Sequence, residues 1–261
     1  MPFAFTMRHY QTFGESSGRL KDRALVSPES WDTLRVGHPF FSISTNREEW
    51  LKASRLEIKK DGQDSDLIRR AQDVADMLTV RNIKRVFSVG SGGGALEYQL
   101  TQLMPGLHIV CSDYSPVTAE TLKKVFTEAD DVIQFDIQKG NWSEVNERYI
   151  TEDGLCLIYQ IDAGLSDDEW REIFKRMAAG GIARVLVIPT GTLTLLSVYN
   201  RTSRELQWRL RGVPVVWSGY VRTKKRFQEQ WRDCYADIEL QLGGLKGFLL
   251  ARKTSKAMAQ S

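Results

Sequence analysis

The sequence contains few cysteines, few histidines and no long hydrophobic run. Only three cysteines occur among the 261 residues, and two of them, Cys111 and Cys156, fall inside apolar, strand-like segments. No disulfide framework is visible, and we therefore expect a reduced, cytoplasmic protein. No apolar run approaches the ~20 residues that a membrane-spanning helix needs, and residues 1–16 lack the apolar core of a signal peptide. We expect no membrane association.

An excess of one charge is also missing. The 36 Lys and Arg residues nearly balance the 33 Asp and Glu residues, and a net charge of +3 is too small to indicate a polyanionic partner by itself. No grouping of His, Cys, Asp and Glu has metal-site spacing, so we predict no metal. With 42% hydrophobic and 26% charged residues, the composition is that of an ordinary globular protein.

The most informative stretch is a glycine-rich turn. The apolar segment 85–89 stops at Gly90, and three further glycines follow at Gly92, Gly93 and Gly94 before a helical pattern begins. Glycines at a strand-to-helix turn let the backbone approach a ligand closely, and the helix start offers free N–H groups. Asp113 follows at the end of the next strand, where a carboxylate can bind ribose hydroxyls. The pair indicates a nucleoside cofactor.

The middle of the chain alternates between strands and helices. We expect strands at 85–89, 108–112, 131–135, 155–160 and 182–188, and the clearest helices at 66–79, 116–126 and 167–178. Two short segments, 238–242 and 247–251, are so close together that they must pair antiparallel. The predicted fold is α/β: a doubly wound, mostly parallel seven-stranded sheet that ends in an antiparallel hairpin.

Both ends of the chain read differently from this domain. Residues 1–65 are rich in aromatic side chains without a clear period, and we expect an N-terminal extension that forms either a cap over the cofactor site or a cover for a sheet edge. Residues 66–252 form the main domain, and 253–261 form a flexible tail. Within 190–233 we expect a helix or two and an apolar bend at 212–220.

Three motifs follow the order found in one enzyme family. VGSGGG at 89–94, CSDYSP at 111–116 and QFDI at 134–137 resemble the motifs of the class I S-adenosylmethionine-dependent methyltransferases, and the likeness covers roughly residues 66–252. The resemblance implies that S-adenosylmethionine is the cofactor. It implies cofactor contacts from Gly90, Ser91, Gly92, Gly94, Asp113, Tyr114, Asp136, Ile137 and Gln160.

The resemblance also implies individual roles. Asp113 would bind the ribose, Asp136 would accept a hydrogen bond from the adenine amino group, and Gln160 would line the methionine end. One position departs from the family pattern. An acid that usually stands two residues before the first glycine, and that helps to hold the cofactor's amino group, is replaced here by Ser88.

Two alternatives remain open. Gly90-x-Gly92-x-x-Ala95 also fits a loose dinucleotide fingerprint, so the rival is an NAD(P)-dependent dehydrogenase. An acid directly after the third strand and the terminal hairpin favour the methyltransferase. Ser88 and the lack of an obvious catalytic base allow a methyltransferase-like protein that binds without catalysis.

The catalytic residue cannot be assigned from the pattern. A hydroxyl acceptor needs a base, and His38 and Asp162 are the two candidates. His108 is expected to be structural, and His9 lies in an uncertain segment. Two aromatic residues, Tyr199 and Tyr220, are candidate lining residues of the acceptor pocket.

A basic stretch offers the main clue to the acceptor. Residues 201–226 contain eight basic side chains and a single acidic one, that of Glu205. The basic residues are Arg201, Arg204, Arg209, Arg211, Arg222, Lys224, Lys225 and Arg226. Arginine binds phosphate and carboxylate groups well. We therefore expect a small anionic acceptor for O- or N-methylation rather than nucleic acid, with a solvated helix face as the alternative.

Overall fold

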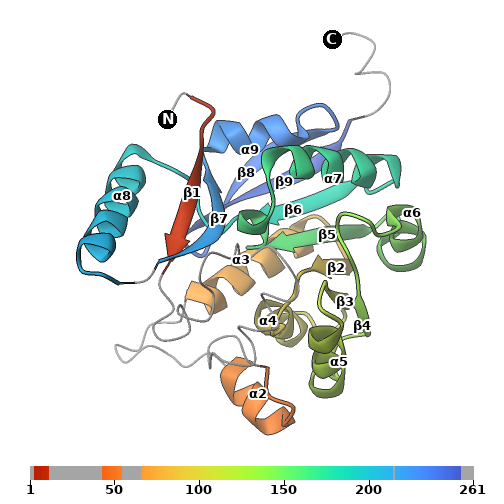
Figure 1. Ribbon diagram of the computed structural model, residues 1–261. Coiled ribbons are helices and arrows are strands. Elements are labelled where there is room, and N and C mark those ends of the chain that lie inside the picture. Colours follow the sequence, from red (N-terminus) through yellow and green to blue (C-terminus); the bar gives the residue numbers. More distant parts are fainter. Residues whose placement is uncertain (1–2, 12–42, 55–65, 214, 254–261) are drawn as a thin grey trace.

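A seven-stranded sheet forms the centre of the computed structural model, which describes residues 3–11, 43–54, 66–213 and 215–253 (Figure 1). In spatial order its strands are β4 (Asp131–Gln134), β3 (His108–Asp113), β2 (Arg85–Val89), β5 (Gly154–Tyr159), β6 (Arg184–Ile188), β9 (Leu245–Arg252) and β8 (Tyr235–Leu242). The strands from β4 to β6 are parallel, and β9 is antiparallel to both β6 and β8. The predicted α/β sheet and its terminal hairpin are confirmed.

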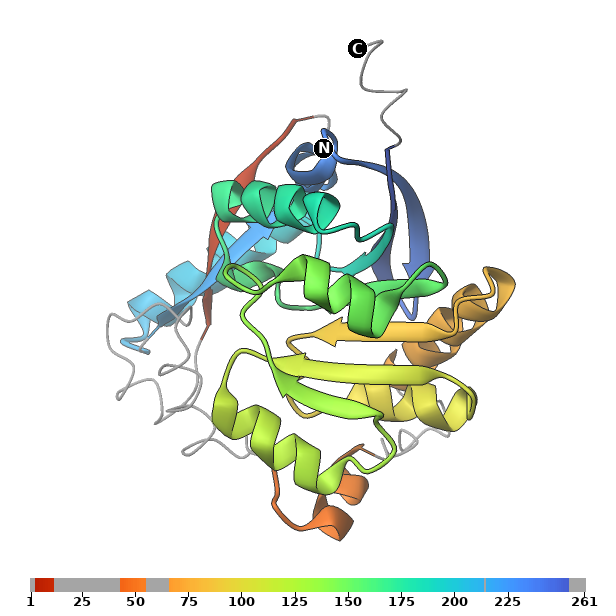
Figure 2. The same cartoon turned by 90° about the vertical axis from the view of Figure 1, so that its right-hand side faces the viewer.

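Helices cover both faces of this sheet, as Figures 1 and 2 show. On one face, buried leucines such as Leu78 and Leu100 join helices to the strands, and on the other a cluster of aromatic rings around Trp170 does so. The first face carries α2 (Arg47–Ser54), α3 (Asp66–Val80), α4 (Ala95–Leu103) and α5 (Pro116–Val125). The second carries α6 (Trp142–Val145), the π-helical turn η2 (Asn146–Ile150), α7 (Asp167–Ala179) and α9 (Lys224–Trp231).

Local sequence signals set several helix ends. The Ser115 side chain accepts a hydrogen bond from the backbone of Thr118 at the start of α5, directly before Pro116. Ser166 and Glu169 form the expected capping box of α7. Along α4, Leu96 and Leu100 are buried, whereas Leu103, the last residue of the helix, is 40% exposed.

The last third of the chain contains a strand where the sequence suggested a bend. After α8 (Leu195–Leu210), β7 (Val216–Arg222) pairs antiparallel with β1 (Thr6–Gln11) in a separate two-stranded sheet. Gly219 allows this strand to lie against the chain after β5, since a Cβ atom there would sit 1.9 Å from the carbonyl oxygen of Ala163. The local sequence predicts a bend here because β1, the strand that pairs with β7, lies about two hundred residues earlier in the chain.

In both views the β1–β7 pair and α8 lie off the carboxyl ends of the parallel strands (Figures 1 and 2). Hydrogen bonds support this placement, because Leu193, which follows β6, donates from its backbone to the carbonyl oxygen of Arg222. Most of the predicted extension 1–65, including His38, lies outside the described residues, as does most of the predicted tail 253–261. The proposed domain boundaries stay predictions.

The Asp167 carboxylate fastens the small sheet to the domain. Its oxygens accept hydrogen bonds from Arg222 (2.6 Å) and Arg226 (2.8 Å), and further ones from Thr6 and Gln230. The Arg222 side chain is fully buried. Burial raises the pKa of Asp167, but hydrogen bonds from Arg222 and Thr6 and the charge of Arg222 outweigh it and lower the pKa to about 2.

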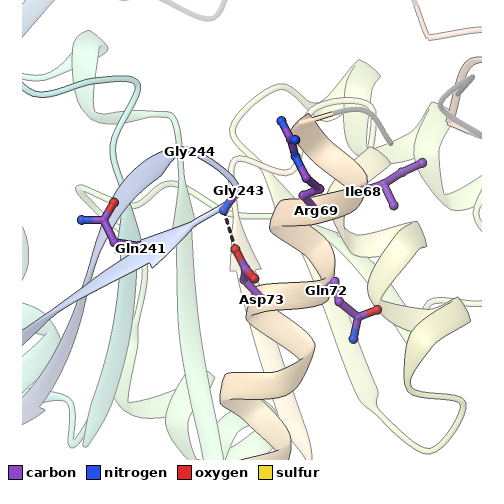
Figure 3. A pocket seen from close by; sticks show the side chains of 7 residues that line it. All are labelled: Ile68, Arg69, Gln72, Asp73, Gln241, Gly243 and Gly244. Carbon is purple, nitrogen blue, oxygen red and sulfur yellow. Dashed lines mark hydrogen bonds between the residues drawn. The ribbon is translucent and has the colours of Figure 1, made fainter. Parts of the chain in front are cut away.

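The terminal hairpin is anchored to α3. Its turn at Gly243 donates a backbone hydrogen bond of 2.5 Å to the carboxylate of Asp73, beside a shallow pocket whose lining side chains are drawn in Figure 3. Arg69, Gln72 and Gln241 surround this contact. The hairpin turn therefore lies against the start of α3, at the same end of the sheet as the glycine turn. Within the described parts of the chain, no helix has the length and apolar character to cross a membrane.

The substitution Asp167→Asn should lower the free energy of unfolding by roughly 3–5 kcal/mol at pH 7, because it leaves the buried guanidinium of Arg222 without its counter-charge. The pKa of Asp167 is lowered in the folded protein, so its stabilising effect is present above about pH 4 and is lost as the pH falls toward 2. The difference between variant and wild type should therefore narrow below pH 4 in urea unfolding.

Asp168→Asn is the matched control. Asp168 adjoins Asp167 in the same helix turn, but its side chain is 90% exposed, and its one ion pair among the described residues is with Arg171. This variant should unfold within about 0.5 kcal/mol of the wild type. Equal losses in the two variants would show that Asp167 has no special role.

Candidate functional site

The glycine-rich turn after β2 has the backbone that its sequence predicts. Gly90, Gly92 and Gly94 all have positive φ angles, between 54° and 71°. A Cβ atom at Gly90 would lie 2.5 Å from the side chain of Ile161, whereas a Cβ atom at Gly92 or Gly93 would have no atom of the described residues, other than its chain neighbours, within 4 Å. Among the described residues, the turn is thus packed at Gly90 and open at Gly92 and Gly93.

Asp113 is fixed beside this turn. Its Oδ2 accepts a hydrogen bond from the backbone N–H of Gly92 (3.1 Å), and its Oδ1 accepts one from Ser115 (2.9 Å). The side chain lies at the end of β3 and the residue is only 6% exposed. Ser91 also donates from its backbone to Ser112 (2.9 Å). The structure therefore brings the glycine turn and Asp113 together, as predicted.

The other predicted site residues follow neighbouring strands. Asp136 lies just after β4 and its Oδ1 accepts a backbone hydrogen bond from Gln138 (2.8 Å), while Ile137 packs against the aromatic core. Gln160 directly follows β5 with a φ of 56°, which is rare outside glycine. Tyr114 is 42% exposed beside Asp113. All of these residues lie at the carboxyl end of the sheet, and their contacts with a cofactor remain predictions.

Solved structures of other proteins are similar to this arrangement. Human N-acetylserotonin methyltransferase, in complex with SAM, aligns with a TM-score of 0.52 and 17% identity over 88% of this chain and 72% of that chain. An O-methyltransferase family protein from Burkholderia thailandensis gives 0.53 and 16% over 91% and 67%. Magnesium protoporphyrin IX methyltransferase from Synechocystis PCC 6803, with bound SAH, gives 0.50 and 13% over 79% and 94%.

The chain has the class I methyltransferase fold. No protein-family model matches the sequence, and no curated protein matches it. The likeness therefore rests on three-dimensional structure, and at these identities it concerns the fold.

Within this methyltransferase fold, a carboxyl group that the motif analysis missed lies under the glycine turn. Ser88, which replaces the expected acid on β2, donates a 2.5 Å hydrogen bond to Oε1 of Glu97 in the first turn of α4. Both residues are buried. Burial raises the pKa of Glu97, an effect that the hydrogen bond from Ser88 partly offsets. The sequence carries one signal of this buried carboxyl group: Glu97 is an acidic residue among the apolar residues of the helical pattern that follows the glycine turn.

A second missed residue comes from the N-terminal segment. The indole of Trp50 on α2 donates a 2.8 Å hydrogen bond to the carbonyl oxygen of Gly93. Its ring packs edge-on against Tyr98 and lies 5.2 Å from the ring of Phe126. Trp50, which belongs to the predicted extension 1–65, thus supports the glycine turn through this hydrogen bond and these ring contacts.

The candidate bases have different surroundings. Asp162 is 2% exposed; its Oδ1 accepts hydrogen bonds from the backbone (2.6 Å) and hydroxyl (2.9 Å) of Thr190, and its Oδ2 is buried without a partner among the described residues. Burial raises the pKa of Asp162. His108 lies 3.5 Å from Asp130 at the amino end of β3, away from the site. Tyr199 is 70% exposed on α8, and Tyr220 lies on β7.

Half of the eight basic residues in the stretch 201–226 form ion pairs within the protein. Arg222 and Arg226 both pair with Asp167, and Arg209 pairs with Glu205. Lys224 pairs with Glu239. Of the described carboxylates, none forms an ion pair with Arg201, Arg204, Arg211 or Lys225. Nor does the described part of the chain contain a group of His, Cys, Asp or Glu side chains arranged to hold a metal ion.

Glu97→Gln should make the stability of the ligand-free protein less dependent on pH. Because the pKa of Glu97 is raised in the folded state, its proton stabilises the native protein at low pH, and this contribution is lost as the pH rises through that pKa. Gln keeps an acceptor for Ser88 and has no proton to lose. Urea unfolding should show the variant to be more stable than the wild type at pH 8.

Glu120→Gln provides the comparison, since Glu120 is an exposed glutamate on α5. This variant should follow the wild type at every pH. If Glu97→Gln also followed it, Glu97 would be fully ionised in the folded protein at pH 8 without cost, against our interpretation.

Proposed function

We propose that the protein is an S-adenosylmethionine-dependent methyltransferase that acts on a small anionic acceptor, by O- or N-methylation. The observation that carries the cofactor is the hydrogen bond between Gly92 and Asp113. It fixes a carboxylate at the end of β3 beside the glycine turn after β2, next to the point between β2 and β5 where the strand order reverses. Nucleoside cofactors bind at this point in doubly wound sheets.

The residues present fit this cofactor. Asp113 has the place and the acceptor atoms for the ribose hydroxyls, and Asp136 and Ile137 lie one strand further on for the adenine. Gln160 lies after β5, on the side of the methionine end. The Glu97 carboxyl beneath the turn supplies the acid that position 88 lacks, close to the place expected for the cationic end of the cofactor.

S-adenosylmethionine supplies an electrophilic methyl group on a sulfonium. The task of the protein is then to align the acceptor with that methyl group and to exclude water. The acceptor side of the site is built from the ends of β5 and β6, the β1–β7 pair and α8. Asp162 joins the ends of β5 and β6 through Thr190, and its Oδ2 has no partner among the described residues. Asp162 is therefore our candidate base for a hydroxyl acceptor, alongside His38, which lies outside the described residues.

The two alternatives make different predictions. A dehydrogenase of the short-chain type would use Tyr220 and Lys224 as a catalytic pair, but Lys224 is engaged in an ion pair with Glu239. A binding protein without catalysis would bind S-adenosylmethionine and form no methylated product. Calorimetry with S-adenosylmethionine, S-adenosylhomocysteine and NADH separates the first case. Tight binding of NADH alone would refute our proposal.

Asp113→Asn should weaken binding of S-adenosylmethionine by roughly 10- to 100-fold, because it removes the charge from the hydrogen bonds to the ribose. Asp130→Asn is the control, because Asp130 accepts a backbone hydrogen bond from Ile109 at the opposite end of the same strand. The control should bind like the wild type. Unchanged affinity in Asp113→Asn, measured by calorimetry on folded protein, would contradict the ribose assignment.

A further inference from the structure

Three cationic or potentially cationic side chains meet between α8 and β1. Nη1 of Arg201 lies 2.8 Å from Nδ1 and 3.1 Å from Nε2 of His9. Nη2 of the same guanidinium lies 3.8 Å from the Cβ position of Gly191, just after β6. Arg204 lies one helical turn beyond Arg201 and is close enough to influence both groups. The two elements that carry the cluster, α8 and β1, lie off the carboxyl end of the sheet (Figures 1 and 2).

No described carboxylate forms an ion pair with Arg201 or Arg204. Glu205, the acid on the same helix, is bonded to Arg209 at 2.9 Å. On β7 the residue opposite His9 is Gly219, which has no side chain, and the nearby Arg222 is bonded to Asp167. Arg201 and His9 are partly buried, whereas Arg204 is exposed. A partly buried guanidinium without a counter-charge is costly, and an anion beside Arg201 removes that cost.

His9 responds to this charge. Burial, and then the charges of Arg201 and Arg204, lower the pKa of His9 to about 4. The contact itself has the same consequence: a guanidinium only donates hydrogen bonds, so the facing nitrogen of His9 must accept and cannot carry a proton. Burial and the charge of Arg204 likewise lower the pKa of Arg201.

We propose that Arg201, Arg204 and His9 form an oxyanion-binding subsite that takes the carboxylate or phosphate group of the methyl acceptor. This inference rests on the proposed function and names the part of the acceptor site that recognises charge. Two guanidinium groups and an imidazole present donors to the oxygen atoms of such a group. The contact of Arg201 with Gly191 sets the subsite next to the end of β6, beside Thr190 and Asp162.

Anion binding at this subsite is coupled to a proton. A bound anion offsets the repulsion from both arginines, so the pKa of His9 rises and the ring takes a proton from solvent. The affinity for the anion therefore increases as the pH falls from about 6.5 toward 4. Because the pKa of His9 is about 4 without the anion and rises when the anion binds, the anion should bind several-fold more tightly at pH 5 than at pH 7.5.

Sulfate is a suitable probe, because it carries two charges and does not titrate between pH 4 and 8. The protein has only three histidines, so the imidazole signals can be followed by nuclear magnetic resonance, with His9 assigned from the variant His9→Gln. We expect His9 to titrate near pH 4 without sulfate and at higher pH with saturating sulfate. Acetate, with one charge, should bind more weakly.

Arg201→Gln should weaken sulfate binding at least tenfold and should let His9 titrate closer to 6.5. Arg201→Lys keeps the charge and should retain part of the effect on His9 while losing affinity. Arg211→Gln is the control, since Arg211 is an exposed arginine at the end of the same helix. It should leave both sulfate affinity and the His9 titration unchanged.

Two results would overturn the subsite. One is a titration of His9 near 6.5 in the sulfate-free wild type, and the other is sulfate binding that Arg201→Gln and Arg211→Gln weaken equally. Calorimetry with S-adenosylmethionine on the same variants keeps this test separate from that of the proposed function. Arg201→Gln should bind the cofactor normally. A wild type that binds sulfate as described but not S-adenosylmethionine would refute the methyltransferase and leave the anion subsite intact.

Discussion

The hydrogen bond between the Gly92 N–H and the Asp113 carboxylate holds together the part of the molecule on which the site depends. It joins the turn after β2 to the end of β3, beside the position between β2 and β5 where the strand order reverses. Buried polar groups lie around this hydrogen bond, and removing them from water costs free energy. Glu97 lies under the turn with a hydrogen bond from Ser88, and Trp50 supports Gly93 from an element that precedes the whole domain.

At the β1–β7 pair a different carboxylate has a similar structural role. Asp167 binds Arg222 and Arg226 and thereby holds β7, α9 and β1 against the domain. In the sequence these arginines belong to a basic stretch that reads as one anion-binding surface. In the structure, Arg222 and Arg226 hold the small sheet to the domain, whereas Arg201, Arg204, Arg211 and Lys225 form no ion pair with a described carboxylate.

Sequence reasoning located the sheet, its hairpin and the glycine turn because those features depend on local patterns: apolar runs, positive-φ glycines and caps such as Ser115. It failed where a residue's partner is distant in the chain. The sequence predicts a bend in place of β7, because the partner strand β1 precedes β7 by about two hundred residues and no local pattern reveals the pairing. Glu97 was missed because only the folded turn shows that it faces Ser88.

The pairing of β1 with β7 also constrains the order in which the protein assembles. His9 and Arg201 are 192 residues apart, whereas the glycine turn and Asp113 are joined over 21. Contacts that close so long a loop form late, after local contacts have reduced its entropy cost. During synthesis β1 must wait for β7 to leave the ribosome. We therefore expect the glycine turn and Asp113 to reach their native arrangement before His9 meets Arg201. Folding intermediates should then contain a complete glycine turn and an unformed anion subsite.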